Sequence, residues 1–333
     1  MSGLEPVMKT VVKQAVGRGI IPFAQRLSRG RQLLRRLGLR TSQDLFGDRI
    51  VSIHFTDGRS FRLAHVDASY LSFQLFWRGG EYYEPITRML LEELLRPGDT
   101  FLDIGAHVGF FTVTIGLSSK TTKIIAFEPN PKNFQILEAN TAANGLTNVV
   151  CEPIAISDQE GTGTLYLTES DMSASLMKDF SVEDTKQIGS KEVPTASLDG
   201  YLQRRQIGGP LVIKVDVEGH ESALFRGAAQ TIAARKPDII LEVLYEAESA
   251  LISQLKSLGY HFYPITDQGL IEEEVPKLVE RLPLVFFNHL LSVRPKEELA
   301  TIFDRVREQV RKINLLETSK YFPEWTPLTR PDE

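Results

Sequence analysis

From residue 100 onward, short apolar runs alternate with amphipathic stretches, and this alternation constrains the fold more than any other feature of the chain. Apolar runs occupy residues 100–104, 123–127, 148–157, 211–217 and 238–244, and stretches with helical spacing lie between them. Strands that are apolar throughout and separated by helices are typical of a parallel sheet that helices cover on both faces. We therefore predict an α/β fold with a doubly wound, mostly parallel seven-stranded sheet.

The remaining patterns fill in this architecture. Residues 50–80 alternate in strand fashion around Thr56-Asp57-Gly58, a hairpin turn signal, and residues 84–99 have helical spacing up to Pro97-Gly98. We expect residues 148–157 to form one strand that 163–168 extend, 169–195 to form a polar loop over one face, and 220–235 to form one helix. Two last strands are expected within 261–265 and 284–293, before a charged helix at about 296–312.

These patterns divide the chain into a basic amphipathic arm (1–45), a β-hairpin-containing extension (46–81), the main α/β domain (82–295) and a C-terminal helix with a tail (296–333). Residues 1–40 contain nine lysines and arginines and a single acid, Glu5. The arm's apolar residues share one helical face. Two interpretations stay open: the arm packs on its own domain or a second copy of the chain, or it binds an anionic membrane surface.

The composition of the 333 residues narrows the class of protein. The net charge of −5 gives no sign of a nucleic-acid partner. Cys151 is the single cysteine, so one chain can form neither an internal disulfide nor a cysteine metal cluster. We find no apolar stretch of about eighteen residues and no secretory signal. The sequence therefore predicts a soluble cytoplasmic protein, with the arm as its one route to the inner membrane face.

The stretch FLDIGAHVGFFT (101–112) joins a predicted strand to a predicted helix through a glycine-containing loop. A dinucleotide-binding loop reads G-x-G-x-x-G, and its second glycine lets backbone N–H groups approach a pyrophosphate. Here Asp103 and Gly105 are followed by Gly109, and His107 stands where that second glycine would be. The loop therefore favours a cofactor without phosphates, such as S-adenosylmethionine. His107 either lines the pocket or caps the helix.

Two acids follow the next predicted strands. Glu128 lies 23 residues beyond Gly105 (128 − 105), close to the roughly 20 residues typical of an acid that binds ribose hydroxyls. A carboxylate can accept from both hydroxyls of a vicinal diol, so we assign Glu128 to the ribose of the cofactor. Asp158 either accepts from the adenine amino group or serves a turn.

The stretch IKVDVEGHE (213–221) concentrates charge at one strand exit. Burying these groups is costly unless they are paired or functional, so we interpret Asp216 as a functional residue. Asp216 and Glu218 could hold a divalent cation such as Mg²⁺ or bind sugar hydroxyls. His220 either takes part in the chemistry or simply begins the next helix. Glu242 ends the following predicted strand.

Several blocks of this sequence, in order, resemble the FkbM-type methyltransferases over about residues 82–245. They are YEPITRMLLEELLRPGDTFLDIGAHVGFFT, AFEPNPKNFQILEANTAANGLTNV, AISDQEG, VPTASLDGYL and IKVDVEGHESALFRGAAQTI. The resemblance implies a class I, Rossmann-like, S-adenosylmethionine-dependent methyltransferase that acts on a hydroxyl of a sugar, polyketide or other small molecule. It also implies the cofactor loop Asp103, Gly105 and Gly109, the ribose ligand Glu128, and the acidic motif of Asp216 with Glu218. SASL (173–176) resembles a serine-containing stretch of the family.

Methyl transfer to a hydroxyl needs an in-line approach of the acceptor oxygen and a nearby base for its proton. Our candidates for the base are Asp216, His220 and Glu242. Alternatively, a cation held by Asp216 and Glu218 lowers the pKa of the hydroxyl.

Other classes remain as alternatives. An NAD-linked oxidoreductase is disfavoured because the second loop glycine is missing. A nucleic-acid methyltransferase should show an Asn-Pro-Pro-Tyr-like motif or a basic catalytic face, and the sequence has neither. A non-catalytic, cofactor-binding or recruitment protein is disfavoured by the intact set Asp103, Glu128 and Asp216. We expect a glycan or small-molecule acceptor as the partner.

Overall fold

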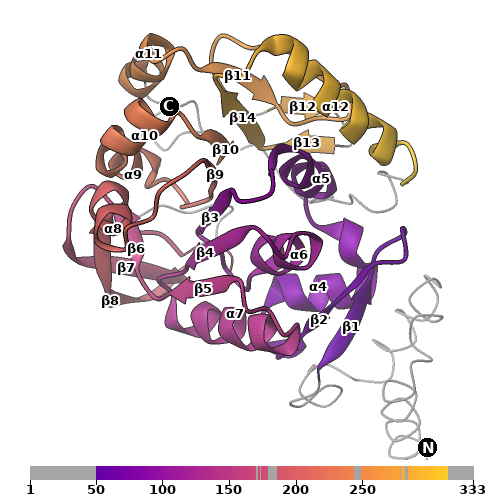
Figure 1. Cartoon of the computed structure of the whole chain (residues 1–333). Coiled ribbons are helices and arrows are strands. Elements are labelled where there is room, and N and C mark those ends of the chain that lie inside the picture. Colours follow the sequence, from indigo (N-terminus) through magenta and orange to yellow (C-terminus); the bar gives the residue numbers. More distant parts are fainter. Residues whose placement is uncertain are drawn as a thin grey trace, which may run out of the picture.

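The computed structural model describes residues 50–169, 172, 174–178, 186–243, 249–277, 279–281 and 284–313. Its main feature is a seven-stranded sheet in the order β11-β14-β10-β9-β3-β4-β5 (Figure 1). Its strands are β3 (Thr100–Ile104), β4 (Lys123–Phe127), β5 (Val149–Glu152), β9 (Leu211–Val215), β10 (Asp238–Glu242), β11 (His261–Pro264) and β14 (Asn288–Ser292). β14 runs antiparallel to its two neighbours, and the other pairs are parallel. The predicted doubly wound, mostly parallel sheet is confirmed.

Helices cover both faces of this sheet, because successive strand residues point to opposite sides. In β3, Phe101 packs into one core cluster and Leu102 into the other. The first face carries α5 (Pro85–Leu94), α6 (Phe110–Ser118), α7 (Pro131–Ala143) and α12 (Lys296–Val310), and the second carries α8 (Leu198–Arg204), α9 (Glu221–Gly227), α10 (Ala229–Arg235) and α11 (Ser249–Ser257). Strands buried on both faces explain the uninterrupted apolar runs of the sequence.

The extension before the sheet contains the predicted hairpin, β1 (Val51–His54) paired with β2 (Ser60–Leu63). The prediction of strand structure up to residue 80 is wrong. The chain forms helix α4 (Tyr70–Arg78) between the short 3₁₀ turns η2 (Val66–Ala68) and η3 (Gly80–Tyr82). Ser69 caps this helix by accepting the N–H of Ser72. Phe61 of the hairpin packs edge-on against Phe110 of α6, so the extension shares the core of the first face.

A second sheet replaces the predicted extension of the third strand and much of the predicted loop. β6 (Ala155–Ser157), β7 (Gly161–Thr168) and β8 (Gln187–Ser197) pair in the order β6-β8-β7. Pro153 separates β5 from β6, and proline cannot donate to a strand ladder. The single strand over 148–157 and the loop over 187–195 are therefore corrected. A short hairpin of β12 (Val279–Arg281) and β13 (Leu284–Phe286) precedes β14.

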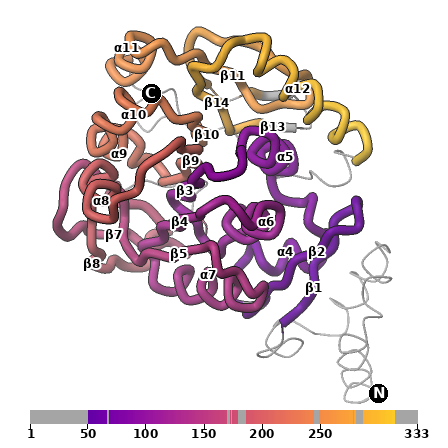
Figure 2. The backbone as a smooth tube through the Cα atoms, in the orientation of Figure 1, coloured from indigo at the N-terminus to yellow at the C-terminus, as the bar shows by residue number. Residues whose placement is uncertain are grey.

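Of two predicted helices, the structure divides one and confirms the other. The helix expected over 220–235 is divided into α9 and α10 at Ala228, whose φ of −111° and ψ of 7° depart from helical values. Gly227, just before this break, packs so closely against Ser157 that a Cβ there would overlap the Ser157 carbonyl oxygen. The charged C-terminal helix is confirmed as α12, which lies along α5 (Figure 2), with an ion pair of 2.6 Å between Arg305 Nε and Glu93 Oε2.

The basic arm lies outside the described residues. No helix among the described residues is long and apolar enough to cross a membrane.

Candidate active site

One edge of the main sheet collects most of the residues that the sequence marks as functional. The carboxyl ends of β3, β4, β9 and β10 lie there, and the antiparallel strand β14 begins there with Asn288. The chain order reverses beside β3, with β4 on one side and β9 on the other. In doubly wound sheets such a reversal opens the crevice in which ligands bind.

The loop from β3 to α6 passes close to the end of β9. Gly105 has a φ of 85°, and a Cβ at this position would overlap the carbonyl oxygen of Asp216. The backbone N–H of Asp216 donates to the carbonyl of Ile104 at 3.0 Å. Gly109, with the same φ, begins α6 and packs against Leu137. Glycine is required at position 105 so that two strand exits can meet backbone to backbone.

Asp103 holds this loop from within the fold. Its buried carboxylate accepts the backbone N–H of Thr112 at 3.0 Å and the Thr112 hydroxyl at 2.6 Å. Burial raises the pKa of Asp103, against the opposing effect of Lys214. The described contacts of Asp103 thus tie β3 to the first turn of α6, and contact with a cofactor stays a prediction.

Glu128 lies directly beside the loop. Its carboxylate accepts the backbone N–H of His107 at 2.7 Å and that of Asn130 at 2.8 Å. Burial raises the pKa of Glu128 to about 7, although His107 and these hydrogen bonds act in the opposite direction. His107 has a left-handed backbone with a φ of 50°, a strained conformation for a residue with a side chain. In this conformation its backbone N–H points to Glu128.

Asp216 forms the centre of an acidic cluster with a buried counterion. Lys214 Nζ donates to Asp216 Oδ2 at 2.8 Å, and the ammonium also lies over the ring of Phe111. Lys214 is 1% exposed. Although burial acts in the opposite direction, the Lys214 charge holds the pKa of Asp216 below its usual value. Asp216 is therefore ionised.

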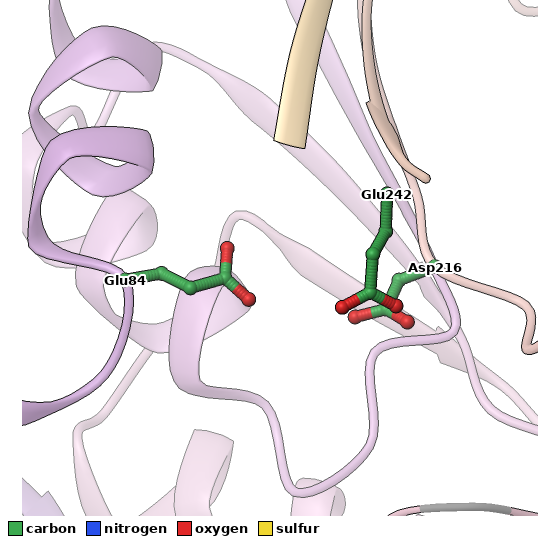
Figure 3. A group of neighbouring side chains, drawn as sticks. All are labelled: Glu84, Asp216 and Glu242. Atoms are coloured by element: carbon green, nitrogen blue, oxygen red, sulfur yellow. The ribbon is translucent and has the colours of Figure 1, made fainter. Parts of the chain in front are cut away.

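Two glutamates complete this cluster (Figure 3). Glu242 ends β10, next to the strand that carries Asp216, and the two carboxyl groups share a hydrogen bond. Glu84 reaches toward them from the start of α5, and one oxygen from each of Glu84, Asp216 and Glu242 lies within 4.8 Å of the others. Burial, with the Asp216 charge adding to it, raises the pKa of Glu242 well above its usual value, so Glu242 carries the shared proton.

Asn288 connects Glu84 to the sheet. It lies opposite Glu242 in the antiparallel pairing of β14 with β10. Its Nδ2 donates to Glu84 Oε2 at 2.9 Å, and the residue is 5% exposed. Its Oδ1 is buried and has no hydrogen-bond partner among the described residues.

Glu218 lies beyond Val215, the last residue of β9. Its backbone is left-handed with a φ of 51°, and its carbonyl accepts the hydroxyl of Ser175 at 2.6 Å. The SASL stretch thus contacts this site through Ser175. The Glu218 carboxyl has a pKa raised well above its usual value by burial and by Asp216, and its Oε2 is buried without a partner among the described residues.

His220 and Asp158 form a separate group beside β6. His220 Nε2 and the Ser157 hydroxyl share a hydrogen bond of 2.9 Å, and Asp158 pairs with Arg226 at 3.3 Å. Burial lowers the pKa of His220. The described contacts of His220 are made with this group and not with the Asp216 cluster. Asp158 is an exposed residue whose carboxylate already has a cationic neighbour.

The donor atoms of the cluster also fit a metal ion in their chemistry. Glu84, Asp216 and Glu242 offer carboxylate oxygens, which hard divalent cations prefer. This set differs from the predicted pair of Asp216 and Glu218. Lys214 already supplies a positive charge at 2.8 Å from Asp216, so the cluster does not depend on a metal for a counterion.

Sequence reasoning missed Glu84 and Asn288, and it noted Lys214 without giving it a role. Glu84 precedes a helix and not a strand exit, and Asn288 begins an antiparallel strand.

Comparison with known proteins finds relatives for the central part of the chain. Residues 103–262 match the family model described as "Methyltransferase FkbM domain". The hexuronic acid methyltransferase AglP of Haloferax volcanii is 28% identical over 149 residues, which are 45% of this chain and 57% of that protein. The 31-O-demethyl-FK506 methyltransferase FkbM of Streptomyces tacrolimicus is 26% identical over 200 residues, covering 52% of this chain and 76% of that one. The match therefore spans little more than half of AglP.

A solved structure of similar description is the methyltransferase FkbM from Methylobacillus flagellatus KT. It shares 17% identity with a TM-score of 0.40, over 67% of this chain and 52% of that chain.

Proposed function

We propose that the protein transfers a methyl group from S-adenosylmethionine to a hydroxyl of a sugar, glycan or other small molecule, because residues 103–262 match the family model described as "Methyltransferase FkbM domain". The names of the two curated relatives, a hexuronic acid methyltransferase and a 31-O-demethyl-FK506 methyltransferase, support a sugar or other small-molecule acceptor.

One observation carries the proposal: the close contact of Gly105 with Asp216, with Glu128 beside the same loop. This contact joins the loop that would take the methyl donor to the acid that would face the acceptor. The binding sites of the methyl donor and the methyl acceptor must adjoin each other, because methyl transfer needs the reacting atoms within about 3–3.5 Å.

The residues of the loop fit S-adenosylmethionine in their chemistry. Gly105 lets the loop lie against the end of β9, and Glu128 offers a buried carboxylate to a ribose diol. No glycine stands at position 107, where a pyrophosphate-binding loop would have one. Bound S-adenosylmethionine supplies a methyl carbon attached to a positively charged sulfur.

In this proposal Asp216 accepts the proton of the acceptor hydroxyl. The acceptor oxygen forms its bond to the methyl carbon, the carbon–sulfur bond breaks, and its electron pair stays on sulfur. The hydroxyl becomes strongly acidic only as the new bond forms, so an ionised carboxylate of low pKa suffices. Lys214 keeps Asp216 ionised before the transfer.

The two other candidates for the base are less well supported. Glu242 is protonated by virtue of its raised pKa, so it donates to Asp216 instead of accepting. His220 contacts Ser157 in the separate group. A metal-assisted route through the carboxylates has no support beyond their oxygen atoms, and we do not adopt it.

Calorimetric titration with S-adenosylmethionine, S-adenosylhomocysteine and NAD tests the proposal. We expect the first two to bind and NAD not to bind. Binding of NAD alone would contradict the proposal, and so would failure of all three.

A further inference from the structure

The acidic cluster borders a buried hydrogen-bond acceptor that lacks a partner. Asn288 Oδ1 is buried and accepts no hydrogen bond from the described residues. The same side chain donates through Nδ2 to Glu84, whose carboxyl group lies with those of Asp216 and Glu242. Lys214, a buried cation of this cluster, is already bonded to Asp216. The described part of the site thus offers acceptor oxygens, and its ammonium is engaged.

Glu84 is held toward this cluster by its backbone and by its neighbour. Its φ of 39° is left-handed, a conformation that costs free energy for a residue with a side chain and persists where the surroundings impose it. Asn288, itself 95% buried (100 − 5), holds the carboxylate from the sheet side. Figure 3 shows the Glu84 carboxylate directed toward Asp216 and Glu242. A strained acidic side chain that faces an ionised Asp216 is poorly explained by stability alone, because burial and the Asp216 charge both raise the pKa of Glu84 and so disfavour its ionised form.

We propose that Glu84, positioned by Asn288, contacts the methyl acceptor, and that the acceptor presents hydroxyl or ammonium donors here and no carboxylate. This inference rests on the proposed function, since it concerns the acceptor of the same reaction. Donors of the acceptor would satisfy the free oxygen of Asn288. A carboxylate in the same place would meet an ionised Asp216 whose described cationic partner, Lys214, is already engaged.

The proposal also assigns acceptor choice to segments outside the FkbM domain match. Glu84 precedes residues 103–262 and Asn288 follows them. The donor-binding loop and Asp216 lie within the match, so the two halves of the site come from different parts of the chain.

Three hexoses of the same ring size test the proposal: glucose, glucosamine and glucuronate. Each is added to the full-length protein saturated with S-adenosylhomocysteine at pH 7.5, and binding is followed by saturation-transfer NMR. We expect glucose and glucosamine to bind, and glucuronate to bind at least about tenfold more weakly, as one unfavourable charge contact predicts.

Two variants and one control connect this preference to the named residues. Glu84→Gln should weaken glucosamine binding by about tenfold and reduce the discrimination against glucuronate, because it replaces an acceptor oxygen by a donor and removes a group that can ionise. Asn288→Leu should weaken glucosamine binding too, since it releases Glu84. Glu297→Gln changes an exposed glutamate on α12 and should alter nothing. Affinity for S-adenosylhomocysteine should be unchanged in all three variants.

The outcomes separate the two proposals. If the unaltered protein fails to bind S-adenosylhomocysteine, the proposed function itself fails. If it binds S-adenosylhomocysteine but prefers glucuronate, binds none of the sugars, or keeps its sugar preference in both Glu84→Gln and Asn288→Leu, the acceptor inference is overturned and the methyltransferase proposal stands.

Discussion

Gly105 and Asp216 touch backbone to backbone at the ends of two neighbouring strands, β3 and β9. The contact leaves no room for a side chain at 105, and it places the loop that follows β3 against the acid that follows β9. Changes at either residue should therefore affect both the fold and the proposed chemistry.

Gly105→Ala should destabilise the protein and abolish binding of S-adenosylmethionine. The left-handed backbone alone costs an alanine about 1–2 kcal/mol, and overlap with the Asp216 carbonyl adds to this. Urea denaturation measures the loss. Gly58→Ala is a matched control, because Gly58 has a φ of 88° and a Cβ added there would meet no atom within 4 Å. Equal losses in the two variants would show that the contact with Asp216 carries no cost.

The affinity for S-adenosylmethionine should rise with pH around the pKa of Glu128. This pKa is about 7 in the folded protein, and the ionised carboxylate is the better acceptor for two ribose hydroxyls. Between pH 6 and 8 the ionised fraction rises about tenfold, and the affinity should follow it. Calorimetry at the two pH values measures the change. Glu128→Gln should bind weakly at both, and a pH dependence that survives in this variant would assign the effect elsewhere.

The roles of Glu128 and Asp216 should separate in kinetics. Glu128→Ala should weaken cofactor binding, whereas Asp216→Ala should remove turnover with less effect on cofactor affinity. Once an acceptor is known, calorimetry and methyl-transfer rates measure both quantities. Equal loss of cofactor affinity in the two variants would contradict this division.

Lys214→Met should cost about 3–5 kcal/mol of unfolding free energy, because it leaves the buried Asp216 charge without its partner. The double variant Lys214→Met, Asp216→Asn should recover part of this loss, since the unpaired charge is then gone. Urea denaturation of the two single variants and the double variant gives the coupling between the residues. Simple additivity would mean that the pair contributes no interaction free energy.

The stability should fall as pH rises, and Glu242 should account for part of the fall. Its folded pKa lies well above the ordinary 4.5, so its contribution is full below pH 4.5 and is lost as pH rises through the folded value. The loss is at most about 1.4 kcal/mol per pH unit. Glu242→Gln keeps the hydrogen-bond donor toward Asp216 and cannot ionise. Its unfolding free energy should therefore depend less on pH between 5 and 9 than that of the unaltered protein, and parallel curves would rule Glu242 out.

The main sheet could be predicted because its strands are buried on both faces and their sequences are therefore apolar throughout. β8 escaped prediction for the opposite reason. Residues 187–192 are exposed, so no apolar alternation marks them, and pairing with β7 makes them a strand. Such pairing between segments distant in sequence leaves no local pattern.

The candidate site was predictable as far as it follows the ends of parallel strands. Asp216 and Glu242 met this rule. Glu84 lies 132 residues before Asp216 (216 − 84) and reaches the site only because α5 packs on the sheet, which no local pattern reveals. The neighbours of His220 in sequence are site residues, yet its side chain shares a hydrogen bond with Ser157, a contact that no local pattern reveals.

The position of β14 determines which fragments of this protein can fold. The matched region ends at residue 262, yet β14 lies between β10 and β11 in the sheet. A fragment of residues 103–262 would lack the strand that fills this slot. β10 would present a bare ladder edge, and the truncated β11 would lose the strand with which it pairs in the described structure. Such an edge invites strand exchange between molecules, so the fragment should associate or aggregate. The stretch that sequence similarity delimits is thus smaller than the unit that can fold.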